Sequence, residues 1–455
     1  MQLDQLPKTY RDAILITRAL KIQYIWIDAH CIFQNDREEV EQEVANMARI
    51  YQNAYLTIAA AAAEDYEGGC MYPVASTLAI EFPQQLPNNE ELLPGDSYTG
   101  KAYVRSDQDF VASVINSPLR TRSWVLQEEL LSPRVLYCAK DQFYWQCPSQ
   151  TASEDGLFEP YYEGYYGHMR SYMRDLRFEL ASAFPESGLE LWYQMIVDYT
   201  SRKLTYSEDR VAAIAGITKW CQDQRSIGMP IAGVWTYDAQ FGLFWKGPQD
   251  QDLQRLPSAS PSLPSWSWLS YNGPIEYQDQ RRSKQSRERM QPDFEIRNSH
   301  IQWSGAPLSS HLISGKLEVH GRLRALQLKH GSEQESSLSF KGLRIWQQLN
   351  RASSKSMFHF APSPARPVKP LFKDKNFILY DAELDCSTNA INNIIYAFRL
   401  STYYVWHHPD KGDDRFLLLE KITAEGSEYR RIGLGWLPRN DELFKDLEPT
   451  LFSLV

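Results

Sequence analysis

One short run of the sequence places a tryptophan and a glutamate at a spacing that could support chemistry. In Trp124-Val-Leu-Gln127-Glu128 the two side chains are four residues apart, so on a helix they lie on one face, one turn apart. A carboxylate among apolar neighbours costs free energy unless it is paired or serves a purpose. Glu128 is therefore a candidate functional carboxylate. The alternatives are an ordinary ion pair with Arg120 or Arg122, or a side chain that faces solvent.

Two more charged residues could bind a substrate. Asp28 ends an apolar run that predicts a buried strand, and ligands of open α/β sheets usually bind at the carboxyl edge of the strands. Arg122 could meet a phosphate or a carboxylate. Each residue also has an ordinary interpretation: Asp28 could cap the following turn through Asn35 or a backbone N–H, and Arg122 could form a structural ion pair.

The other chemically suggestive residues do not form a recognisable site. His30 and Cys31 are neighbours in a segment expected to be extended, where adjacent side chains point opposite ways. His407-His408 with Asp410 lacks the ligand spacing of a zinc site. Gly68-Gly69 and Gly433-Leu-Gly435 lack the strand–loop–helix context of a phosphate loop. The sequence therefore predicts no metal site.

The composition is that of a soluble globular protein. The chain has 455 residues, of which 43% are hydrophobic and 23% charged, so wholesale disorder is excluded and two to four domains are expected. The net charge of -9 argues against nucleic acid as a partner, because phosphate contacts need a basic surface. No membrane span or secretory signal is apparent, and six cysteines without a pairing pattern fit a reducing compartment. These features predict a cytoplasmic protein.

The elements that must position the candidate residues alternate between helix and strand in the first 150 residues. Thr9 is expected to cap the first helix, and Asp36 with Glu39 forms a capping-box pattern at the start of the second. Two apolar runs joined by an amphipathic helix predict a right-handed βαβ unit and therefore a parallel sheet. The expected helices cover 10–20, 36–53 and 119–131, and the expected strands cover 22–28, 54–60, 134–139 and 142–147.

The rest of the chain changes character twice. Helical periodicity over 189–202 and 208–224 predicts a helical region from 151 to 270. A basic segment that includes Arg281 and Arg289 predicts a solvated linker over 271–300. The final region, 301–455, is expected to be mostly β, with strands over 316–328, 377–384, 394–406, 415–422 and 429–437. The first domain is expected to cover 1–150.

Several ordered motifs resemble fungal heterokaryon-incompatibility (HET) domain proteins. The strongest is Pro118-Leu-Arg-Thr-Arg122-Ser-Trp124-Val-Leu-Gln127-Glu128, followed by Leu131-Ser-Pro-Arg134. Earlier blocks are Leu6-Pro-Lys-Thr-Tyr-Arg-Asp-Ala13, Tyr24-Ile-Trp-Ile-Asp28-Ala-His-Cys31 and Met47-Ala-Arg-Ile-Tyr51-Gln-Asn-Ala54, and 199–216 with Pro264-Ser-Trp266-Ser-Trp268 resemble the family tail. The resemblance implies a role in non-self recognition and programmed cell death after fusion of unlike hyphae. It also implies assembly into homo- or hetero-oligomers with other signalling proteins.

One departure from the family pattern affects the expected fold. HET domains usually begin with a block resembling Leu-Ser-Tyr-x-Trp-Gly upstream of the Leu-Pro-x-Thr motif, and this sequence starts almost at that motif. A parallel sheet without that strand would expose unpaired backbone groups and apolar surface. The sequence therefore predicts an N-terminally truncated HET domain, and an inactive truncated paralogue is one hypothesis for its function.

A more distant similarity suggests an enzymatic hypothesis. HET domains are similar to TIR domains, which have a flavodoxin-like sheet, and some TIR domains hydrolyse the nicotinamide–ribose bond of NAD with a glutamate in a Trp-Cys-x-x-Glu helix. The similarity implies NAD as a substrate, Glu128 as the catalytic carboxylate and Trp124 as a wall of its pocket. Nicotinamide leaves as a neutral molecule, so one carboxylate that stabilises the oxocarbenium-like transition state suffices, without metal or another cofactor.

Overall fold

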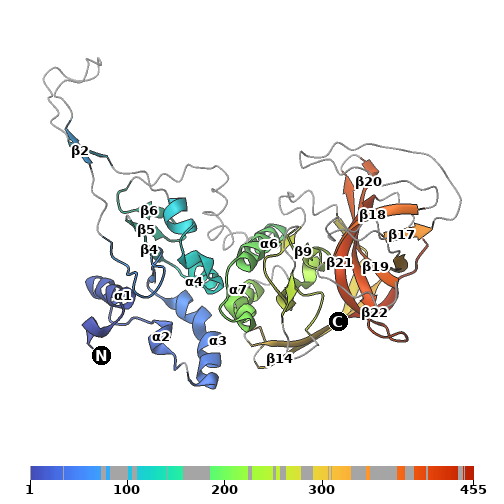
Figure 1. Ribbon diagram of the computed structural model, residues 1–455, viewed down its shortest axis with the longest axis horizontal. Helices are drawn as coiled ribbons and strands as arrows, with labels where there is room; N and C mark the ends of the chain where they lie inside the picture. The colour runs from blue at the N-terminus through green and yellow to red at the C-terminus, as the bar shows by residue number, and fades with distance from the viewer. Residues whose placement is uncertain are drawn as a thin grey trace, which may run out of the picture. The chain divides into compact units, whose positions relative to one another are not determined.

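The computed structural model shows two compact units, Met1–Arg174 and Asp175–Val455 (Figure 1). The structure describes residues 2–33, 35–72, 78–81, 101–104, 110–140, 142–156, 185–223, 228–248, 253–256, 263–277, 290–305, 307–308, 310–328, 345–348, 377–384, 394–405, 408–438, 444 and 446–455.

The first unit combines α-helices with a small mixed sheet (Figure 1). The strands follow the order β1-β4-β5-β6, in which β1 and β4 are parallel and the other pairs antiparallel. The helices are α1 (Lys8–Ala19), α2 (Asp28–Cys31), α3 (Arg37–Asn53) and α4 (Ser123–Leu131), with short turns η1 (Leu3–Gln5), η2 (Val111–Ile115) and η3 (Leu119–Thr121). The strands are β1 (Thr57–Ala59), β4 (Val135–Cys138), β5 (Phe143–Gln146) and β6 (Thr151–Ser153), and β2 (Leu78–Glu81) pairs with β3 (Lys101–Val104).

The local signals of the sequence are confirmed for α3 but not for the start of α1. The Asp36 carboxylate accepts a hydrogen bond from the Glu39 amide at 3.2 Å, which satisfies one of the free N–H groups at the start of α3. Helix α1 begins at Lys8, directly after Pro7, so Thr9 lies inside the first turn and is not the cap. Its hydroxyl instead accepts a hydrogen bond from the Gly69 amide at 2.9 Å.

The prediction of a buried strand over 22–28 is wrong, and so is the purely parallel sheet built on it. This segment is extended at Ile27 (φ -133, ψ 118) but forms no ladder, and Tyr24 is 86% exposed. An apolar run favours burial, whereas a strand also needs a partner with free backbone groups. The parallel pair is instead β1 with β4, and the connection between them includes α4.

The predicted helix over 119–131 is interrupted. Pro118 leads into the short turn η3, and Arg122 is extended (φ -88, ψ 132), so that α4 starts only at Ser123. The hairpin predicted over 134–147 is confirmed by the antiparallel pairing of β4 with β5. Aromatic rings fill the core next to these strands: the ring of Phe110 lies 5.9 Å from that of Tyr137 and 5.5 Å from that of Tyr144.

The second unit begins with helices and ends in a large sheet. The helices α6 (Pro185–Ser201) and α7 (Ala212–Asp223) confirm the periodicity over 189–202 and 208–224, with η4 (Ser207–Arg210) between them. Short strands and turns follow: β7 (Pro230–Ile231), β8 (Val234–Trp235), η5 (Thr236–Asp238), α8 (Ala239–Gly242), β9 (Trp245–Lys246), β10 (Gln254–Arg255), η6 (Trp268–Ser270), β11 (Tyr271–Asn272) and β12 (Glu276–Tyr277).

In the residues that the structure describes, the C-terminal sheet has ten strands and closes on itself in part. The antiparallel pairs of β16, β17, β18, β21, β20 and β19 form a closed ring, while β22, β15 and β14 continue from β21, and β13 pairs with β19. The expected β-rich region is therefore confirmed. The strands are β13 (Met290–Pro292), β14 (Phe294–Trp303), β15 (Leu312–Gly321), β16 (Leu323–Leu328), β17 (Ile345–Gln348), β18 (Phe377–Leu384), β19 (Ile394–Val405), β20 (His408–Lys421), β21 (Glu428–Pro438) and β22 (Thr450–Leu454).

The segment expected to be a linker, 271–300, is strand at both of its ends. Tyr271 and Tyr277 are buried in β11 and β12, and β13 and β14 join the large sheet. The basic run between Arg281 and Arg289 lies outside the described residues. The aromatic and alternating residues that flank this run are the sequence signals for strands. The other expected boundaries, at 150 and 270, stay predictions.

A buried arginine joins the large sheet to the aromatic core of the second unit. Arg431 in β21 is 1% exposed, and its guanidinium donates to the carbonyl oxygens of Leu243, at 2.6 Å, and of Trp245. The guanidinium carbon also lies 3.8 Å from the centre of the Trp245 ring, a cation–π contact. Trp266 and Trp268 are both fully buried in the same core, where Trp266 lies in a turn and Trp268 begins η6.

Candidate functional site

Helix α4 is enclosed by protein except at two positions. Seven of its nine residues are buried, and the two that keep surface open to solvent are Trp124 and Glu128. They are one turn apart on the same face, as their spacing predicts. The sequence therefore identified the one accessible strip of an otherwise buried helix.

The C-terminal end of α4 is held by the neighbouring strand. The Ser132 hydroxyl lies 2.5 Å from the carbonyl oxygen of Glu128 and 2.6 Å from the Thr57 hydroxyl in β1. Near the other end, Arg120 pairs with the buried Glu129 at 3.1 Å. These contacts fix the rotation of α4 about its axis and its position along that axis. The direction of the Glu128 side chain is therefore set by tertiary packing as well as by the helix.

Tyr51 of α3 is a hydrogen-bond partner of the Glu128 carboxyl group. Burial is the largest cause that raises the pKa of Tyr51 well above its ordinary value, and the charge of Glu128 comes next. The Trp26 ring packs edge-on against Tyr51 with ring centres 5.9 Å apart. Tyr51 is therefore a neutral hydrogen-bond donor in a fixed position.

Asp28 and Arg122 lie close enough to act on the same groups. The charge of Asp28 raises the pKa of Glu128, Tyr51 and Tyr10, and the charge of Arg122 lowers the pKa of all three. Both residues are exposed. Asp28 of α2, Tyr51 of α3 and Arg122 thus lie near Glu128 at the open face of α4, and Tyr10 of α1 lies near Asp28 and Arg122. We call Tyr10, Asp28, Tyr51, Arg122 and Glu128 the acidic cluster.

The structure brings together three of the four predicted site residues, Asp28, Arg122 and Glu128. It adds Tyr10 and Tyr51. Asp28 begins the short helix α2, where its carboxylate accepts a hydrogen bond from the Ala29 amide at 2.7 Å, so it is not at the edge of the sheet as expected. His30 lies on the same turn, not in an extended segment, with its ring edge-on to Tyr10 at 4.9 Å. Tyr51 was missed as a site residue, although it stands in one of the quoted motifs.

The environment of Glu128 makes its carboxyl group an unusually weak acid. Burial is the largest cause that raises the pKa of Glu128 from 4.5 to about 7. The positive charge of Arg122 acts in the opposite direction, the charges of Asp28 and Glu129 raise the pKa further, and the Tyr51 hydrogen bond lowers it. Glu128 therefore exchanges a proton near neutral pH while keeping part of its surface open to solvent.

This raised pKa predicts that the first unit becomes less stable as the pH rises from about 4.5 to about 7. The folded state holds the Glu128 proton more tightly than the unfolded chain, so ionisation in this window favours unfolding. Each pKa unit corresponds to about 1.4 kcal/mol, and screening of a partly exposed group leaves an expected loss on the order of 1–2 kcal/mol. Urea unfolding between pH 4.5 and pH 8 measures the slope, which Glu128→Gln should flatten. An unchanged slope in that variant would assign the titration to another group.

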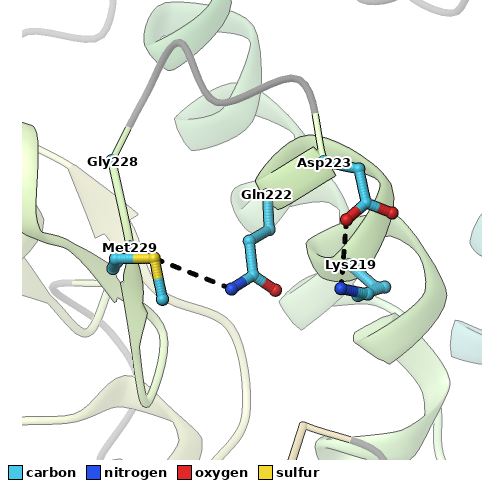
Figure 2. Close-up of a pocket in the computed structure, with 5 residues that line it drawn as sticks. All are labelled: Lys219, Gln222, Asp223, Gly228 and Met229. Carbon is cyan, nitrogen blue, oxygen red and sulfur yellow. Dashed lines mark hydrogen bonds and ion pairs between the residues drawn. The ribbon is translucent and has the colours of Figure 1, made fainter.

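A hollow of about 430 Å³ in the second unit is a further candidate site. Figure 2 shows that Lys219, Gln222 and Asp223 of α7 face Gly228 and Met229 across it. Its ion pair, Lys219 with Asp223 at 3.0 Å, has both side chains more than half exposed. A solvated pair of this kind supplies no group with unusual reactivity, so the acidic cluster is the better candidate site.

Two further features of the described residues bear on partners. No group of three or more His, Cys, Asp or Glu side chains among them is arranged to hold a metal ion. In the same part of the chain, every helix is too short or too polar to cross a membrane.

One comparison with known proteins gives a match, and it lies within the first unit. The model of the family described as Heterokaryon incompatibility protein (HET) matches residues 1–128, which include every residue of the acidic cluster. A search of curated proteins gives no match, and neither does a search of solved structures. The match covers the quoted motifs from Leu6 to Glu128, and the motifs beyond it stay a resemblance. The family match therefore places a HET domain in residues 1–128, a little over a quarter of the chain.

Proposed function

We propose that this protein acts in non-self recognition of the heterokaryon-incompatibility type and that its HET domain transmits the signal for cell death by assembling with other signalling proteins. The observation that carries this proposal is the HET match over residues 1–128. The open strip of α4, with Trp124 and Glu128 accessible on a helix that is otherwise buried, gives the domain a fixed surface for such contacts. Exposed groups on a rigid element can be recognised without a cost for ordering them.

Expression of the full chain from an inducible promoter in a fungal host tests this proposal. Induction should stop growth. Trp124→Ala and Glu128→Ala should each restore growth to the level of the empty-vector strain, because each removes one of the two accessible side chains of α4. Glu67→Gln is the matched control, since Glu67 is exposed in the same unit and outside the acidic cluster. Normal growth of a host that accumulates the unaltered protein would contradict the proposal and support an inert paralogue.

The acidic cluster supports a second candidate function, hydrolysis of the nicotinamide–ribose bond of NAD. In this reaction the C–N bond breaks and its electron pair goes to the nicotinamide ring, which leaves neutral. Water then bonds to the ribose carbon and gives up a proton. Glu128 is the carboxylate that would offset the positive charge on the ribose, and Tyr51 would hold it in place. Glu128 can play this role only when it is ionised. Because its pKa is about 7, part of it is protonated near neutral pH, so the reaction should depend on pH.

A further inference from the structure

The segment 22–27, which connects α1 to α2, forms neither helix nor strand although its sequence favours a strand (Figure 1). The run Ile22-Gln-Tyr-Ile-Trp-Ile27 consists almost entirely of β-branched and aromatic residues. Its backbone is extended at Ile27. What the segment lacks is a partner strand among the described residues.

The backbone in the middle of this segment keeps its hydrogen-bonding groups available. No N–H or C=O group of four successive residues bonds to another described residue; these are Gln23, Tyr24, Ile25 and Trp26. Both ends, in contrast, are held: the Ile22 amide donates to the Thr17 carbonyl at 3.1 Å, and the Ile27 carbonyl accepts from two amides of α2. Because backbone donors and acceptors need partners, the middle of the segment is a ready edge for a strand from outside.

The segment is anchored to the first unit and still exposes apolar surface. The contact of the Trp26 ring with Tyr51 fixes it against α3. Tyr24 in its centre is 86% exposed, and so are Leu20 just before it (47%) and Phe33 after α2 (73%). Exposed apolar side chains gathered in one stretch of chain are typical of an interaction surface.

We infer that the segment 22–27 pairs antiparallel with the same segment of a second copy of the chain and so joins two first units. The charges at its two ends favour this occupant. Lys21 comes directly before the segment and Asp28 directly after it, and both side chains are exposed. In an antiparallel pair each Lys21 lies at the end that carries Asp28 of the other copy, so opposite charges meet, whereas a parallel pair would bring like charges together.

The backbone of the segment also suits a symmetric pair. In an antiparallel ladder centred on Ile25, the two copies of Ile25 lie opposite each other, and Tyr24 of each copy exchanges N–H···O=C bonds with Trp26 of the other. The two copies then contribute the same residues, as a twofold axis requires. Because both copies use the same edge, the contact closes as a dimer and does not propagate into a fibre.

The edge of β1 is a weaker candidate for the same kind of pairing. The Thr57 amide donates to the Arg134 carbonyl at 3.0 Å, so in the parallel ladder Thr57 and Ala59 bond to β4. Only Ile58 of this three-residue strand directs its backbone groups away from β4. The segment 22–27 offers a longer run of unpaired groups and charges at both ends.

A dimer of this kind deepens the proposed function, on which its role in signalling rests, because it names a second copy of the chain as one partner in the assembly. The two proposals can still fail separately. A chain that dimerises through this segment but leaves growth unaffected on induction would contradict the cell-death role and keep the dimer. A chain that stops growth but stays monomeric would do the reverse.

The oligomeric state of the purified full chain tests the inference. One strand pair is a small interface, so we expect a Kd on the order of 10 μM, and light scattering should show a change from monomer to dimer through this range. Hydrogen exchange should be slower in the dimer for amides within 23–26, because they gain hydrogen bonds. A chain still monomeric at about 100 μM, or a dimer in which these amides exchange as in the monomer, would overturn the inference.

Charge reversal tests the antiparallel direction of the pair. Lys21→Glu places two like charges at each end of its own dimer, and so does Asp28→Lys, so each variant alone should dimerise about 10-fold more weakly at low salt. An equal mixture of the two variants should regain the affinity of the unaltered chain, because every end then joins opposite charges again. Equal affinity in both variants and the mixture would contradict the pairing.

A disulfide between copies tests the centre of the pair. In a chain that also carries Cys31→Ala, which removes the exposed thiol of α2, Ile25→Cys should form a covalent dimer on mild oxidation because the two cysteines face each other. Tyr66→Cys in the same background is the matched control, since Tyr66 is 58% exposed in the same unit and outside the segment. Cross-linking to the same extent at both positions, or at neither, would show that the copies do not meet at Ile25.

Discussion

Glu128→Gln should reduce nicotinamide release from NAD by at least about 10²-fold, the size of effect seen when a group that stabilises transition-state charge is removed. Glutamine has nearly the same shape and keeps an oxygen that can accept from Tyr51, so the fold of α4 should survive. Its neutral amide cannot offset a positive charge on the ribose. The measurement is nicotinamide formed per unit time by the purified full chain, at concentrations that promote self-association.

The pH dependence of this reaction follows from the raised pKa of Glu128, at about 7. Because the ionised form is the active one, the rate should rise with pH through about 7 and level off above it. Tyr51→Phe serves as the matched variant: it removes the hydrogen bond that lowers the pKa of Glu128, so the rise should move to higher pH. Cleavage that survives in Glu128→Gln would remove Glu128 from the mechanism, and a purified protein that never cleaves NAD would leave only the assembly role.

Gly69→Ala should destabilise the first unit by about 2–4 kcal/mol, through backbone strain and a steric clash together. Gly69 has φ +90, and a Cβ there would lie 2.0 Å from the Lys8 Nζ atom and 2.6 Å from an Asp12 carboxylate oxygen. Lys8 could swing away, but Asp12 is buried and bonded to the amides of Cys70 and Met71. Relief of the clash would therefore break the contacts that hold the segment 68–72 to α1.

Gly156→Ala is the matched control for this prediction. Gly156 also has a positive φ, +70, but no atom lies within 4 Å of a Cβ placed there. It should cost only the backbone strain, about 1 kcal/mol. Urea unfolding of the full chain, followed by hydrogen exchange of amides in α1, measures both variants. If both variants lost the same free energy of unfolding, the segment 68–72 would not be packed against Lys8 and Asp12.

The elements that the sequence predicted correctly are those with a strong local pattern. The helix over 36–53 has a capping pair and an apolar stripe, and the hairpin over 134–147 has two β-prone runs with a short connection, and both are present. Element type over such segments depends on contacts within a few residues. The strand expected over 22–28 failed because its pairing depended on a partner elsewhere, which periodicity does not identify.

The candidate site, like the fold, was predicted from the sequence only in part. The spacing of Trp124 and Glu128 determined that they share one face of a helix, and the quoted motifs pointed to the HET domain that the family match then identified. The tertiary structure alone decided that this face is the open strip of α4, and that Tyr51 of α3, Asp28 of α2 and Arg122 surround the carboxyl group.

What the sequence by itself determined about this protein is therefore local: which residues share a helix face, where α3 starts, and which family the first 128 residues match. Only the tertiary structure decided which strands pair, that six strands of the second unit close into a ring, and that the pKa of Glu128 is raised to about 7. The physical reason is that helix geometry depends on near neighbours, whereas strand pairing and desolvation depend on groups that the chain brings together from distant positions.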